Sequence, residues 1–85
     1  MTLPTLHMNG TSKEELVGNL CAAITALNDA YEAMKQCAPH GRDYYPQGSN
    51  ALKKATDEHL ARLRLVDQVK LEMEALVNAI DAIGD

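Results

Sequence analysis

Apolar residues recur with helical spacing in two long segments, one over residues 11–38 and one over residues 50–82. Steps of three and four residues place such side chains on one stripe of an α-helix, whereas a strand would need strict alternation. The sequence therefore predicts an all-α protein with two long helices. The first stripe carries Leu16, Leu20, Ala23, Leu27, Tyr31 and Met34, and the second carries Leu52, Ala55, His59, Leu63, Val66, Met73, Val77 and Ile80.

The segment between these helices, residues 39–49, reads PHGRDYYPQGS. Two prolines and two glycines within eleven residues exclude a continuous helix and predict one turn. Residues 1–10 contain Pro4 and Gly10 and are expected to form an apolar arm that packs onto another part of the protein. At the start of the first helix, either Thr11 with Glu14 or Ser12 with Glu15 fits a capping box.

The 85 residues form at most one domain, predicted over 1–85. Helices of these lengths span about 40 and about 50 Å. Side by side they share one seam, which would leave apolar surface of each helix in water. We therefore expect an antiparallel two-helix hairpin that assembles with copies of itself into an oligomeric helical bundle.

A net charge of −4 argues against general binding to nucleic-acid backbones, although a basic stretch in the second helix could attract a small anion. The N-terminus lacks the pattern of a signal peptide, and no run of about 18 apolar residues predicts a membrane span. Cys21 and Cys37 would lie about 24 Å apart on one helix, which is too far for a disulfide. They are expected to be buried thiols of a cytoplasmic protein.

The turn concentrates residues suited to a nucleotide-like ligand. Tyr44 and Tyr45 offer rings for stacking, and the planar fork of Arg42 suits a phosphate or carboxylate. A structural role is the alternative, in which both tyrosines close the end of the bundle and Arg42 pairs with Asp43 or with a helix terminus.

Two further groups of polar residues are candidates for ligand binding. His7, Asn9 and Thr11 precede a helix N-terminus, where anions bind readily. They could instead form only a turn and a cap. His59 lies on the apolar stripe with Arg62 about one turn further on, so it could face a ligand or be hydrogen-bonded within the core.

The first helix separates the arm from the turn within one chain. If hairpins pair antiparallel, the arm of one protomer lies near the turn of its partner, and a site between subunits follows as a hypothesis. No catalytic pattern is recognisable, and the three histidines lack metal-ligand spacing. We therefore expect no enzyme activity, no metal and no cofactor.

The motifs His7-Met8-Asn9-Gly10-Thr11-Ser12 and Arg42-Asp43-Tyr44-Tyr45-Pro46-Gln47-Gly48 resemble those of a group of small uncharacterised phage and prophage proteins. The resemblance covers nearly the whole chain and implies no activity. In size and architecture the chain is more loosely similar to phage anti-defence proteins, small helical oligomers that sequester cyclic nucleotides or ADP-ribose-type signals.

These observations predict a phage-type oligomer that sequesters a small anionic, nucleotide-derived immune signal without catalysis. Its partners would be copies of itself and a ligand such as a cyclic nucleotide or an ADP-ribose derivative. The alternative is a structural or adaptor protein that binds a virion or host protein through its apolar helical faces.

Overall fold

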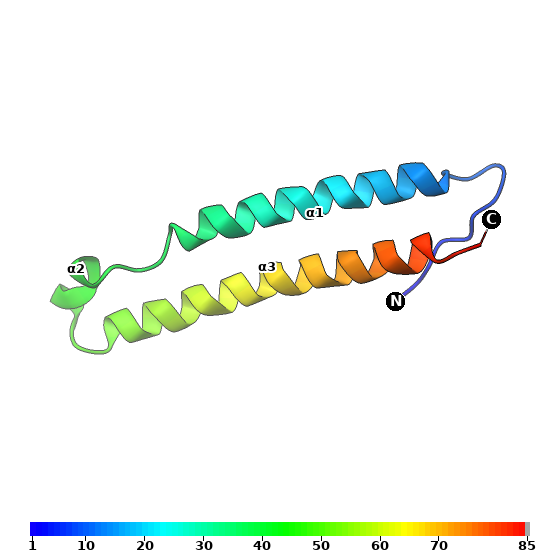
Figure 1. The fold of residues 1–85 in the computed structure, drawn as a ribbon. Coiled ribbons are helices and arrows are strands. Elements are labelled where there is room, and N and C mark those ends of the chain that lie inside the picture. Colours follow the sequence, from blue (N-terminus) through cyan, green and yellow to red (C-terminus); the bar gives the residue numbers. More distant parts are fainter. Residues whose placement is uncertain (85) are drawn as a thin grey trace.

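The computed structural model is all-helical, as the spacing of apolar residues predicts, and it describes residues 1–84. The last residue of the predicted domain 1–85 lies outside the described residues. Two long helices, α1 (Lys13–Lys35) and α3 (Ala51–Asp81), run antiparallel and pack along their length (Figure 1). A short helix, α2 (Gly41–Tyr44), and a 3₁₀ turn, η1 (Tyr45–Gln47), connect them.

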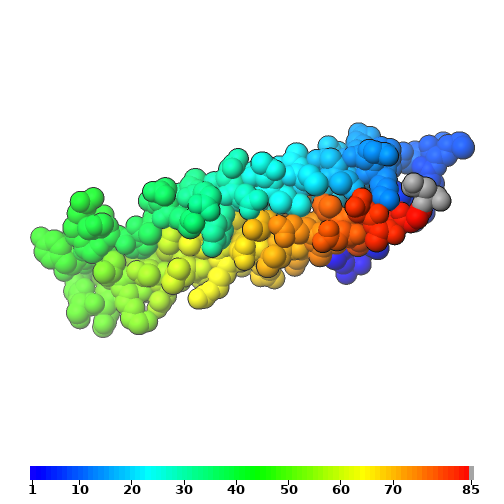
Figure 2. Space-filling view, viewed as in Figure 1, coloured from blue at the N-terminus to red at the C-terminus, as the bar shows by residue number. Residues whose placement is uncertain are grey.

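The hairpin is a rod of 62 × 20 × 17 Å. Its radius of gyration of 18.9 Å exceeds the roughly 12 Å expected for a compact domain of this length. The space-filling view shows α1 and α3 side by side over most of the rod (Figure 2). The N-terminal arm lies at the C-terminal end of α3, whereas α2 lies at the far end (Figure 1). The rod therefore has an arm end and a turn end.

Helix α1 is shorter than the predicted 11–38. It begins after Ser12, whose hydroxyl accepts a hydrogen bond from the Glu15 backbone N–H at 3.1 Å. Of the two capping pairs, the structure thus uses Ser12 with Glu15 and leaves Thr11 outside the helix. At the other end, backbone N–H groups of residues 36–38 donate to carbonyls three residues earlier, so the last turn tightens and ends before Pro39.

The linker is more ordered than the predicted turn, because it contains α2 and η1. Gly48 follows η1 with φ of 109°, a conformation that side chains disfavour. Asn50 occupies the N-cap position of α3 but makes no side-chain capping hydrogen bond. Helix α3 then covers 51–81, within one residue of the predicted 50–82 at each end.

The core is small. Among residues 1–84, the buried side chains are His59, Leu63 and Ile80, all on α3. The predicted stripe of α1 faces α3 but its members are only half-buried. The prediction of buried thiols is wrong, since both cysteines are exposed. Cys21 lies on α1 outside the stripe that α3 covers, and Cys37 lies beyond the end of α1. No helix in residues 1–84 is long and apolar enough to cross a bilayer.

Candidate functional site

The turn end contains an open pocket of about 440 Å³, which α2, η1 and the start of α3 border on one side. Arg42, Tyr44 and Tyr45, which the sequence singles out, all line it. Tyr44 is half-buried, whereas Tyr45 is 77% exposed and does not close the end of the rod. The remaining lining residues are Gly41, Gly48, Ser49 and Leu52.

Local hydrogen bonding positions the arginine. The His40 side chain caps α2 by accepting a hydrogen bond from the Arg42 backbone N–H, with an Nδ1–N distance of 3.2 Å. Within the described residues, Arg42 takes part in no ion pair, so its guanidinium is not neutralised by Asp43. The pocket thus combines two tyrosine rings with an arginine whose guanidinium group is available to bind an anion.

Near the turn pocket, one lysine at the start of α3 is neutralised by an ion pair. Lys53 Nζ donates a hydrogen bond to an Asp57 carboxylate oxygen at 2.8 Å. This hydrogen bond, together with the attraction of the carboxylate, raises the pKa of Lys53. Lys53 does not line the turn pocket, and among the lining residues the positive charge is that of Arg42.

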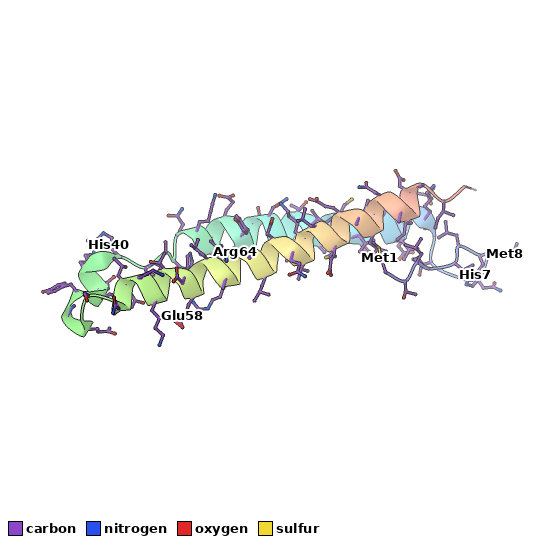
Figure 3. All side chains as sticks on the ribbon, turned by 90° about the horizontal axis from the view of Figure 1, so that it is seen from below. Met1, His7, Met8, His40, Glu58 and Arg64 are labelled. Carbon is purple, nitrogen blue, oxygen red and sulfur yellow. The ribbon has the colours of Figure 1, made fainter. Side chains whose placement is uncertain are left out.

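Two further pockets lie at the arm end. One, of about 460 Å³, is lined by Lys13, Glu14, Val17, Gly18 and Asp81. The other, of about 320 Å³, is the arm pocket. His7 and Thr11 line it together with Leu6, Ser12, Lys13, Glu14 and Gly84. Asn9 is exposed in the adjoining turn and is not among the lining residues. Figure 3 shows His7 and Met8 at this tip and His40 at the opposite tip of the rod.

Two contacts shape the arm end. The His7 ring packs so closely over Gly10 that a Cβ atom there would lie 2.8 Å from His7 Nε2. A side chain at position 10 would therefore displace the exposed His7 ring. Lys13 Nζ donates a hydrogen bond to the Ile83 carbonyl at 2.8 Å and ties the start of α1 to the end of α3.

The two candidate residues on α3, His59 and Arg62, line neither the turn pocket nor the pockets at the arm end. His59 is 7% exposed, within the seam between the long helices, and its Nε2 has no hydrogen-bond partner in residues 1–84. Arg62 is exposed on α3. Of the two interpretations of His59, the structure supports a core position, although without the hydrogen bond that a core histidine usually makes.

The structure therefore brings the three turn candidates together and separates them from the arm candidates by most of a 62 Å rod. Sequence analysis missed Leu52 as a pocket residue because helical periodicity assigned it to the core stripe. It missed Lys13 because no local pattern reveals a contact with residue 83. In the part of the chain that the structure describes, no cluster of three or more metal-ligating side chains occurs.

Comparison with models of protein families, with curated proteins and with solved structures finds no match to this chain.

Proposed function

We propose that this chain is a self-associating, phage-type binding protein that sequesters a small anionic, nucleotide-derived signal without chemical conversion. The observation that carries the proposal is the convergence of Arg42, Tyr44 and Tyr45 on one pocket at the turn end. A base would stack on the tyrosine rings, and the arginine would bind a phosphate through its planar fork.

The dimensions of the turn pocket support a small-molecule ligand. A volume of about 440 Å³ lies within the range of about 300–1,000 Å³ that is typical of ligand pockets. Leu52 adds apolar contact beneath the polar groups, a combination common in binding sites.

The exposed area supports self-association. The chain exposes 6331 Å², whereas a compact monomer of 9.3 kDa would expose about 5,000 Å². The excess of about 1,300 Å² is comparable to the share of one subunit in a substantial dimer interface. With two buried apolar side chains in residues 1–84, the hairpin alone has little core to stabilise it.

The experiment is thermal melting of the protein with a panel of cyclic dinucleotides and ADP-ribose derivatives. A ligand present at 100 times its dissociation constant stabilises the folded state by about 2.7 kcal/mol and raises the melting temperature by several degrees. We expect Arg42→Ala and Tyr44→Ala to abolish this shift while the protein keeps its oligomeric mass. Arg64→Ala, on the exposed surface of α3, serves as the matched control and should leave the shift unchanged. No shift with any member of the panel would refute the proposal.

A second candidate function follows from the exposed apolar residues of α3. Leu65 and Val69 lie one helical turn apart and are both exposed, as expected of a surface that binds another protein. An adaptor for a virion or host protein would use this surface and would leave the turn pocket empty. A protein that melts identically with and without every nucleotide of the panel would favour the adaptor.

A further inference from the structure

Large exposed apolar side chains are distributed unevenly between the long helices. On α1 the large apolar residues are at least half-buried, whereas α3 exposes Leu65 at 63%, Leu71 at 54%, Val69 at 46%, Leu60 at 42% and Leu52 at 37%. Of these, Leu65 and Val69 are four residues apart and therefore neighbours on one face of the helix. A partner helix could cover both side chains of this pair at once.

Charged residues flank this pair symmetrically. Arg62 lies three residues before Leu65, and Glu72 lies three residues after Val69. The resulting steps of three, four and three place all four side chains on one face of α3. Arg62 and Glu72 are both exposed, and within residues 1–84 neither takes part in an ion pair.

This arrangement is complementary to itself when two α3 helices run antiparallel. Positions 62 and 72, like positions 65 and 69, are symmetric about position 67. An antiparallel pair centred there sets Leu65 against Val69 of the partner subunit and Arg62 against Glu72 of the partner subunit, twice each. A parallel pair would instead oppose arginine to arginine and glutamate to glutamate, which is unfavourable.

We propose that two copies of this chain form a twofold dimer through antiparallel α3 helices, with Leu65 and Val69 at the centre and Arg62–Glu72 ion pairs on either side. The second copy is the occupant that the symmetry of these charges specifies, since the two faces of a twofold interface are identical. The area that the chain exposes beyond that of a compact monomer of the same mass is surface that such a dimer could cover.

The same register has a consequence for the pockets. It sets the start of α3, at Ala51, level with Ile83 of the partner subunit. The turn pocket of one protomer then lies at the same position along the long axis as the arm pocket of its partner. A ligand site shared between subunits would rest on the proposed function, but the dimer itself requires no ligand.

Sedimentation of the ligand-free protein tests the interface. We expect a dimer whose dissociation constant rises about tenfold or more in Leu65→Gln and in Val69→Gln. Leu71→Gln is the matched control, because Leu71 is 54% exposed on a different face of α3, and it should leave the dimer intact. Far-UV circular dichroism verifies that each variant remains helical. A monomeric wild type at high concentration, or a dimer weakened only by Leu71→Gln, would overturn the proposal.

Charge reversal tests the register. Arg62→Glu alone and Glu72→Arg alone place like charges against each other in the antiparallel dimer, so each should weaken association. The double variant Arg62→Glu with Glu72→Arg restores both ion pairs and should recover dimerisation. If the double variant dimerised no more tightly than the single variant with the higher dissociation constant, the antiparallel register would be overturned. Because all masses are measured without nucleotides, a failure of this test is independent of the ligand panel.

Discussion

Helices α1 and α3 pack against each other, yet they differ in how their apolar residues are distributed. Helix α1 carries one apolar stripe, which the seam covers only in part. Helix α3 carries the three buried residues of the described chain and, on other faces, large apolar residues that remain in water. The large apolar residues of α1 thus lie along the seam, whereas α3 also exposes such residues on other faces.

This difference indicates where further contacts are to be expected. A helix in a hairpin buries a stripe of limited width, and the hairpin itself does not bury apolar side chains outside that stripe. On α3 five large apolar side chains are exposed, and Leu65 and Val69 are the two that lie one helical turn apart on one face; the others are Leu52, Leu60 and Leu71. We expect α1 and α3 to differ in solution as they do in the structure.

The largest effect is expected at Ile80, which is 1% exposed. Ile80→Ala should reduce the free energy of unfolding by about 2–5 kcal/mol, because it removes buried methyl groups and leaves a cavity. Leu27→Ala, at a half-buried position of α1, should reduce it by less. Urea denaturation at one protein concentration measures both variants. An equal or larger loss for Leu27→Ala would mean that α1 is buried by a contact beyond the hairpin.

A gain in stability is expected at His59. Its Nε2 atom is buried and makes no hydrogen bond in residues 1–84, and burying such a group unpaired costs about 1–3 kcal/mol. His59→Leu should therefore increase the free energy of unfolding by about that amount. His59→Gln retains a polar group and should give no gain. If His59→Leu destabilised the protein in urea denaturation, Nε2 would have to be hydrogen-bonded in solution.

The smallest effect concerns the helix N-termini. Ser12 accepts a hydrogen bond from the Glu15 backbone, whereas Asn50 makes no side-chain capping bond. Ser12→Ala should cost about 1 kcal/mol, and Asn50→Ala should cost less than half as much. Thermal melting of the two variants provides the comparison. Equal losses would show that both helices are capped in the same way.

Much of the helical architecture could be predicted from periodicity. The ends of α3 agree with the prediction to within one residue, because a glycine-containing turn precedes it and Gly84 follows it closely. The end of α1 was predicted three residues too late, since apolar spacing continues into residues whose backbone has already tightened before Pro39. The short helix α2 was missed because four residues are too few to show a helical period.

The candidate site was predictable in part. Arg42, Tyr44 and Tyr45 are close in sequence, so a local turn brings them to one pocket. The assignment of His59 could not be decided from its spacing, because a stripe position is compatible with the core or with a ligand. The structure places it in the seam.

Helical periodicity and proline act over a few neighbouring residues, so local sequence is enough to predict two long helices with a break between them. Which part of each stripe is covered depends on how α1 packs against α3. The same packing sets the contact of Lys13 with Ile83, seventy residues away, and places the turn pocket and the arm pocket at opposite ends of the rod. Burial and long-range contact depend on where a second helix lies, and a local pattern contains no information about its position.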